Sequence, residues 1–171
     1  MELNKLTAIS PVDGRYRKQL AGLDEYFSEY ALIKYRVLVE VEYFLFLADK
    51  KFFKLPLKIR NKLEDLAGNF DLNDAEHIKQ TEAITNHDVK AVEYFIKQNL
   101  ESFGGGNIKE WVHFGLTSQD INNTSVPLLW KNCMEHEYLP AVINLQKILL
   151  KLAKQWASIP MLARTHGQPA S

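Results

Sequence analysis

Residues 28–49 read SEYALIKYRVLVEVEYFLFLAD, and this stretch decides the fold. Ser28 is a residue type that caps helix N-termini. Apolar residues then recur at intervals of mostly three and four positions, namely Ile33, Val37, Val41, Phe44, Leu45 and Ala48. Because this spacing places apolar side chains on one face of an α-helix, the stretch predicts a long helix with one buried face.

Two shorter helical patterns follow this stretch. The first is led by Pro56 and closes at Gly68, which is typical of a helix with proline at its start and a glycine C-cap. The second has an acidic start at residues 73–76, where a capping residue and negative charge favour a helix N-terminus. Its pattern is interrupted at residues 85–87 and resumes from Val89 to Leu100, so we expect a kink or break there.

The last third of the chain also has a helical pattern. A triple glycine at residues 104–106 is typical of a linker, and a helical run extends from about Gln119 to about Ser158. Within that run, apolar side chains form a seam of the kind that packs in helix bundles: Val142, Leu145, Leu149, Leu152 and Trp156. Pro127 and Pro140 should kink or divide the run. No alternating strand pattern competes with it, so the sequence predicts an all-α fold.

Composition excludes several classes of protein. The 21 Lys and Arg residues balance 21 Asp and Glu residues, which argues against binding to nucleic acid or to an anionic membrane surface. The longest apolar run, around residues 43–48, is too short to span a bilayer. A single cysteine, Cys133, and an N-terminus without a signal-peptide core predict a cytoplasmic protein. Cys133 and His136 have no second pair of ligands, so we predict no zinc site.

Four polar clusters are more than a helical scaffold requires. Asp13-Gly14-Arg15-Tyr16 delivers a guanidinium, which suits a phosphate or carboxylate, beside a phenol. Thr85-Asn86-His87-Asp88 lies at the expected helix break, where Asp88 can orient His87 if the backbone lets them meet. Each cluster also has a plain structural interpretation: the first is a surface turn, and the second is an exposed helix start.

The other two clusters lie later in the chain. Thr117-Ser118-Gln119-Asp120 starts the long helical run, where hydroxyl groups and unpaired amides can bind an anion. Arg164-Thr165-His166-Gly167-Gln168 carries a histidine that can transfer a proton near neutral pH. Taken alone, the third cluster is an ordinary N-cap and the fourth an ordinary loop.

Taken together and in this order, the clusters resemble those of the adenylosuccinate lyase family, within the fumarase and argininosuccinate lyase superfamily. The matching segments are SPVDGRY at 10–16, TNHDVKAVEYF at 85–95, TSQDINN at 117–123 and RTHGQPA at 164–170. The resemblance implies β-elimination of fumarate from adenylosuccinate, which gives AMP, and from the succinylcarboxamide ribotide of purine synthesis. It implies no metal or organic cofactor.

The resemblance also implies roles for the first two clusters. Arg15 and Tyr16 would contact the nucleotide, with Arg15 at its phosphate. Asn86, His87 and Asp88 would form a second strip of the pocket. His87 would help to orient the substrate or the catalytic acid.

In the last two clusters, Thr117 and Ser118 would hold a carboxylate of the succinyl group. His166 would be the general acid that protonates the departing nitrogen, with Thr165 as a further substrate contact. Carboxylate binding and proton donation are separate roles for a chemical reason. Removing a proton next to a carboxylate builds negative charge on that carboxylate in the transition state. Departure of the nitrogen then needs a separate proton donor.

The resemblance further predicts the organisation of the chain. Residues 1–110 would form an N-terminal all-α domain, and residues 111–171 would begin a central helical bundle with its first long helix. The family forms homotetramers whose sites are shared between subunits, and its general base lies in an S-S-x-M-P-x-K-x-N-P loop that this sequence lacks. We therefore expect an N-terminal fragment that is inactive alone.

Two alternatives remain open from the sequence. Another fumarate-releasing lyase of the superfamily would share the helical scaffold and the carboxylate-binding hydroxyl groups, although the DGRY turn favours a nucleotide. A non-catalytic helical module would instead use the seam at residues 142–156 to bind partner helices, and the polar clusters would be caps and turns.

Overall fold

The computed structural model describes residues 1–10, 13–160 and 162–170. Pro11 and Val12, which belong to the SPVDGRY motif, lie outside the described residues, as do Met161 and Ser171. The chain separates into two compact units, Met1–Cys133 and Met134–Ser171. The all-α prediction is confirmed, because helices form nearly all of the regular structure.

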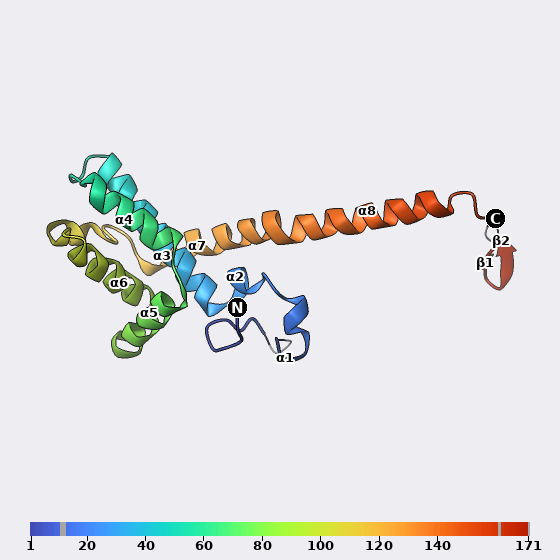
Figure 1. The fold of residues 1–171 in the computed structure, drawn as a ribbon, viewed down its shortest axis with the longest axis horizontal. Helices are drawn as coiled ribbons and strands as arrows, with labels where there is room; N and C mark the ends of the chain where they lie inside the picture. The colour runs from blue at the N-terminus through green and yellow to red at the C-terminus, as the bar shows by residue number, and fades with distance from the viewer. Residues whose placement is uncertain (11–12, 161, 171) are drawn as a thin grey trace. The chain divides into compact units, whose positions relative to one another are not determined.

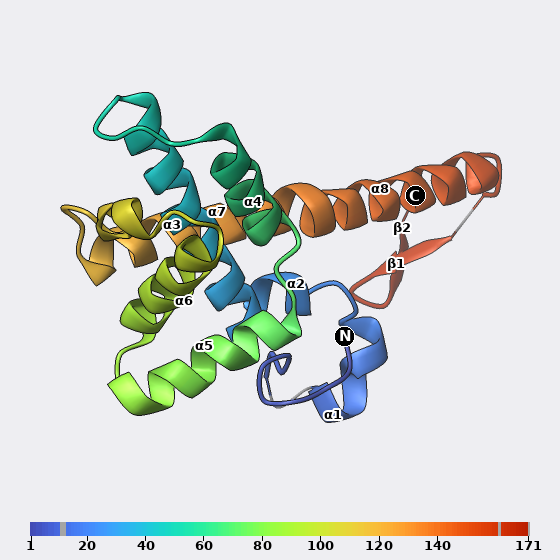
Figure 2. The same cartoon turned by 60° about the vertical axis from the view of Figure 1, so that its left-hand side comes forward.

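The first unit is built on α3 (Glu29–Asp49), the helix predicted from residues 28–49. The Ser28 hydroxyl caps it by accepting a hydrogen bond from the Ala31 amide at 3.1 Å. Val37, Val41 and Phe44 are fully buried on the predicted apolar face. The helices that pack against α3 are α2 (Asp24–Phe27), α4 (Leu57–Gly68), α5 (Leu72–Thr85), α6 (Asp88–Ser102) and α7 (Ser118–Cys133) (Figures 1 and 2).

Both shorter helices form where the sequence predicts them, with a correction at each. Gly68 is the last residue of α4, and Asn69 is its C-cap, so the predicted glycine C-cap is wrong. Helix α5 begins earlier than expected because Asp71 is its N-cap. The Asp71 side chain accepts from the amides of Asn73 and Asp74, and the Asp74 side chain accepts from the Asp71 amide. This reciprocal capping box satisfies donors that a helix start leaves unpaired.

The predicted break near residues 85–87 is confirmed. Helix α5 ends at Thr85, and Asn86 adopts a left-handed conformation with φ of 52°, which asparagine tolerates better than most residues. His87 is then extended and serves as the N-cap of α6. The two helices pack against each other (Figure 2), and their junction presents the second polar cluster.

A turn-rich segment connects α6 to α7. It contains the 3-10 helix η2 (Gly106–Trp111), followed by a loop in which His113 and Gly115 have positive φ values of 61° and 73°. Helix α7 then starts at Ser118 and includes Pro127 in its interior. The loop and the first turn of α7 present the third polar cluster.

The second unit contains a π-helical turn, Met134–Tyr138, the helix α8 (Leu139–Trp156) and a short hairpin. No residue of α8 is buried, although Val142, Leu145 and Leu149 are large and apolar. The helical run is divided at the π-helical turn before α8, whereas α7 continues through Pro127. Pro140 lies in the first turn of α8, a position where proline is tolerated.

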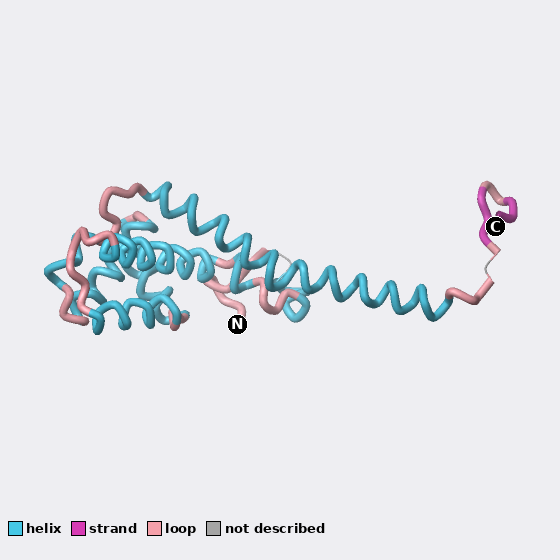
Figure 3. The backbone as a smooth tube through the Cα atoms, turned by 90° about the horizontal axis from the view of Figure 1, so that it is seen from above, coloured by secondary structure: helices cyan, strands magenta, loops and turns pink. Residues whose placement is uncertain are grey.

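The hairpin at residues 163–170 differs from the expectation that no strands form. Strand β1 (Ala163–Thr165) pairs antiparallel with β2 (Gln168–Ala170), and Thr165 lies opposite Gln168 (Figure 3). His166 and Gly167 form the connection with positive φ values of 49° and 77°. Such a pair is the signature of a type I′ turn, which suits the twist of two-residue hairpins. Three-residue strands are too short to show an alternating pattern.

Candidate active site

His87 lies at the centre of the candidate site. Its Nδ1 accepts a hydrogen bond from the Lys90 amide at 3.2 Å, which makes the ring the cap of α6. The proton of the neutral ring is therefore on Nε2, because Nδ1 is the acceptor. This Nε2 atom lies 3.5 Å from the Ser118 hydroxyl oxygen. The backbone break thus directs one imidazole nitrogen from the second cluster at a hydroxyl group of the third.

The third cluster has an internal contact that the sequence did not reveal. Asp120 accepts hydrogen bonds from the Thr117 amide at 2.7 Å and from the Thr117 hydroxyl at 2.9 Å. These two bonds hold the pKa of Asp120 below its ordinary value. Both donors of Thr117 are therefore engaged, whereas the Ser118 hydroxyl faces His87 at the positive end of the α7 dipole.

Asp88 is directed away from the ring of its neighbour. One of its oxygens accepts from the Val89 amide at 2.8 Å, and the other pairs with the Arg36 guanidinium at 2.7 Å. Burial alone would raise the pKa of Asp88, but the Val89 amide and the Arg36 charge outweigh it and lower the pKa. The nearest approach of Asp88 to His87 Nδ1 is 3.7 Å. Its carboxylate is thus engaged mainly with α3 and with the start of its own helix.

Two further contacts connect α3 to the loop before α7. His113 Nδ1 lies 2.5 Å from the Glu40 carboxylate, which is completely buried. The Tyr43 hydroxyl donates to the Phe114 carbonyl at 3.0 Å. Burial raises the pKa of Glu40 even though His113 acts in the opposite direction.

Arg15 and Tyr16 lie apart from this set of contacts. They end α1 (Asp13–Tyr16), both are exposed, and the guanidinium lies 5.3 Å from the Tyr16 ring centroid. The neighbouring Arg17 is the one bound internally, to Asp13 and Asp24 at 2.7 Å each. Among the described residues, no hydrogen bond or ion pair joins Arg15 or Tyr16 to His87 or Ser118. The turn therefore presents Arg15 outward, in a form that can receive an anion.

The fourth cluster belongs to the second unit. His166 is exposed at the turn of the hairpin. Thr165 ends β1, but its side chain lies outside the described residues. Within the first unit, the sequence-predicted residues therefore form a joined set around His87 and Ser118 and an exposed turn at Arg15, and His166 lies in the hairpin of the second unit.

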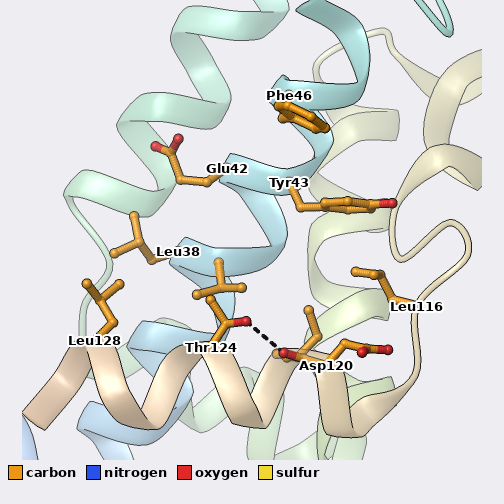
Figure 4. A pocket seen from close by; sticks show the side chains of 10 residues that line it. Leu38, Glu42, Tyr43, Phe46, Leu116, Asp120, Thr124 and Leu128 are labelled. Atoms are coloured by element: carbon orange, nitrogen blue, oxygen red, sulfur yellow. Dashed lines mark hydrogen bonds between the residues drawn. The ribbon is translucent and has the colours of Figure 1, made fainter. Parts of the chain in front are cut away.

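An apolar pocket of about 540 Å³ lies between α3 and α7, beside this set (Figure 4). Glu42 and Asp120 are the charged residues in its lining, and none of its lining residues is basic. Such a pocket suits apolar groups and disfavours phosphates or carboxylates. We therefore do not assign the anionic ends of a substrate to it.

Two features are absent from residues 1–10, 13–160 and 162–170. No group of three or more His, Cys, Asp or Glu side chains is arranged to hold a metal ion. No helix in these ranges has both the length and the hydropathy of a membrane span.

Sequence reasoning missed Arg36, Glu40 and His113. The first two are charged residues that lie within the apolar stripe of α3, and both are buried in the fold. Their place in the apolar pattern of the sequence could have identified them, because a charged side chain that is buried usually has a specific partner. His113 stands four residues before Thr117, and only the fold shows that it meets Glu40.

Comparisons with known proteins identify a family and several similar proteins. A family described as lyase matches residues 14–171. The chain is 52% identical to the adenylosuccinate lyase of Dictyostelium discoideum over 180 residues, and 44% identical to that of Vibrio cholerae over 176 residues. It is 43% identical to the adenylosuccinate lyase of Escherichia coli K12. All of this chain is covered in each case, whereas it spans 38% to 39% of the length of those relatives.

Proposed function

This chain belongs to the lyase family, and from that premise we propose that the protein carrying it releases fumarate from adenylosuccinate to give AMP. The observation that carries the proposal is the contact of His87 with Ser118, because it joins two motifs separated by 31 positions. The names of the relatives support the substrate. The same β-elimination on the succinylcarboxamide ribotide of purine synthesis is part of the proposal.

We assign the stabilisation of developing charge to Ser118. Proton removal next to a carboxylate builds negative charge on its oxygens, and a hydroxyl at a helix N-terminus can donate to them in the transition state. Thr117 supports this position, because its two bonds to Asp120 fix the first turn of α7. Thr117 becomes a substrate ligand itself only if the substrate carboxylate displaces Asp120.

Substrate orientation is the role proposed for Asn86, His87 and Asp88. His87 presents its Nε2 proton toward Ser118, so it can donate to a substrate oxygen placed beside that hydroxyl group. Asn86 supplies the left-handed residue that makes the break, and its exposed amide can contact the nucleotide. Asp88 contributes by holding the start of α6 through its bond to Arg36.

Arg15 and Tyr16 are proposed to bind the nucleotide, with the Arg15 fork on its phosphate. His166 is proposed as the general acid for the departing nitrogen, and Thr165 as a substrate contact beside it. No residue of this chain matches the serine that serves as general base in the family. We therefore propose that residues 1–171 do not turn the substrate over by themselves.

We also propose that the protein is a cytoplasmic homotetramer with sites shared between subunits. The exposed apolar side chains of α8 support the assembly, because a helix with this pattern gains stability by packing against others. We propose further that residues 1–110 form an N-terminal all-α domain and that residues 111–171 begin a central helical bundle. The single cysteine supports a reducing compartment.

Thermal unfolding of the chain with AMP or argininosuccinate tests the substrate class. Ligands that bind the folded state raise the unfolding temperature. We expect millimolar AMP to raise it by more than argininosuccinate does, and we expect Arg15→Ala to remove the effect. Stabilisation by argininosuccinate alone would contradict the nucleotide assignment and favour another lyase of the superfamily.

A further inference from the structure

One face of α3 carries three polar side chains that all reach segments of the candidate site. Arg36, Glu40 and Tyr43 are spaced by four and three positions, so they project from the same side of the helix. Arg36 and Glu40 are buried at 6% and 0% exposure. Burying charged groups is costly unless each finds a partner, so their partners define what this face does.

Arg36 joins the starts of two helices. Its Nη2 donates to Asp88 Oδ2 at 2.7 Å, and its Nε donates to Asn122 Oδ1 at 3.0 Å. Asp88 is the first residue of α6, and Asn122 lies in the second turn of α7. A guanidinium is planar and donates in fixed directions. The separation of the two helix starts is therefore set by one rigid group.

Glu40 and Tyr43 hold the loop that leads into α7. Glu40 contacts the His113 ring at 2.5 Å, and Tyr43 donates to the Phe114 carbonyl at 3.0 Å. His113 has a positive φ of 61°, a strained conformation for a residue other than glycine. The contact with the buried Glu40 carboxylate can hold His113 in this conformation. The loop then continues through Gly115 to Thr117 and Ser118.

Several charged side chains lie near the Glu40–His113 pair and affect the pKa of Glu40. Glu93 on α6 is buried and acts on Glu40 with the same sign of charge. Lys90 and Lys97 neutralise Glu93 at 2.8 Å and 3.0 Å. His113 in turn acts on Asp120 at the start of α7. The second oxygen of Glu40 is buried with no hydrogen-bond partner among the described residues, so His113 holds the carboxylate through the first oxygen, Oε1.

We propose that Arg36 and Glu40 of α3 are positioning residues, which hold the His87 segment and the His113–Ser118 segment at the separation that brings His87 Nε2 to the Ser118 hydroxyl. Neither residue touches that contact itself. The catalytic meaning of the contact rests on the proposed function, but the positioning of the two side chains does not.

Nuclear magnetic resonance on the 171-residue chain tests this directly. In the wild type, the His87 ring protons should show a cross-peak to the Ser118 β protons, and the ring nitrogens should show the proton on Nε2. Arg36→Met should abolish the cross-peak and speed hydrogen exchange of the Lys90 amide roughly tenfold, because the bond from α3 to the start of α6 is lost. Glu40→Leu should also abolish the cross-peak, because it releases the loop that leads from His113 to Ser118.

Conservative and matched variants separate positioning from general stability. Glu40→Gln keeps a side chain that can bond to His113, so the cross-peak should return. Lys34→Met, on the same helix but paired with Glu25 away from the site, should leave it unchanged. If Arg36→Met does not fold, Asn122→Ala removes one partner and should weaken the cross-peak while helix content is retained.

A cross-peak that persists in folded Arg36→Met and Glu40→Leu chains would overturn the proposal. The measurement requires no substrate, so a protein that acts on a different substrate would leave this result intact. Conversely, loss of the cross-peak would not establish that adenylosuccinate is the substrate.

Discussion

Asp88 shows how a motif residue can act through a partner outside the motif. Its pKa is lowered because the Val89 amide and the Arg36 charge favour the ionised carboxylate over the effect of burial. A carboxylate with a lowered pKa in the folded state adds stability above its unfolded pKa and loses this contribution as pH falls through the folded pKa. The ordinary value is 3.8, so the contribution disappears below that pH.

Replacing Asp88 by Asn should therefore destabilise the chain at neutral pH. The neutral amide leaves the buried Arg36 charge without its ionic partner, and we expect a loss of about 1–2 kcal/mol, discounted because Asp88 itself is partly exposed. Urea unfolding at pH 7 and pH 3 measures the difference. It should be smaller at pH 3, because the contribution of Asp88 is lost as pH falls below 3.8 toward its lowered folded pKa, and exposed Asp65→Asn should show little change at either pH. A difference that grows on acidification would contradict this account.

Glu40 should have the opposite dependence on pH. Burial raises its pKa above the ordinary 4.5, so folding favours the protonated form, and the wild type loses stability as pH rises from 4.5 through the folded pKa. Glu40→Gln has no such titration. The free energy of unfolding of the wild type, relative to this variant, should fall between pH 4 and pH 8 in urea titrations. A relative increase over that range would show that the fold prefers the charged carboxylate.

At the scale of elements, helix ends decide where the site residues lie. Asn86 turns the chain in a left-handed conformation, and His87 caps α6. Ser118 opens α7, with Asp120 fixing its first turn. Since each helix start exposes unpaired amides, the candidate site lies at two adjacent N-termini.

The capping box of α5 offers a test of this dependence on helix ends. Asp71→Ala removes a side chain that accepts from two amides, so we expect a loss of about 1 kcal/mol in the free energy of unfolding. Glu76→Ala, an exposed position on the same helix, should change it by a few tenths at most. Urea unfolding measures the free energy of unfolding of both variants and of the wild type. Equal stabilities would mean that α5 depends on packing and not on its cap.

Periodicity and capping residues were enough to predict these helices. The apolar repeat of residues 28–49 predicts α3 because a helix face repeats every three to four residues, and the weak propensities at residues 85–87 predict the break. The partners of Arg36 and Glu40 could not be predicted, because Asn122 and His113 lie 86 and 73 positions away in the sequence. The 163–170 hairpin was missed because two positive φ values leave little trace in a sequence.

At the scale of the whole molecule, the second unit differs from the first. The first has an apolar core around α3, whereas α8 in the second has no buried residue. Exposed apolar faces of this kind are typical of association surfaces. The described residues therefore form one unit with its own core and one whose long helix, α8, has exposed apolar side chains.

Self-association should consequently depend on the α8 seam. Leu149→Glu places a charge on the apolar face, so we expect the weight-average mass in sedimentation experiments to fall toward that of a monomer. Lys154→Glu also introduces a carboxylate on α8, but at a position that is already charged, and should have a smaller effect. A wild-type chain that sediments as a monomer at all concentrations would remove the support that α8 gives to a homotetramer.

We propose that this chain supplies part of a site that releases fumarate from adenylosuccinate. The most direct measurement replaces the matching region of the Escherichia coli relative with residues 1–171 and follows fumarate release. We predict release of fumarate, with kcat/KM reduced about 100-fold or more by Ser118→Ala, because a donor to developing charge is lost. A folded, correctly assembled chimera that releases no fumarate, or whose rate is unchanged by Ser118→Ala and His87→Ala together, would contradict the account.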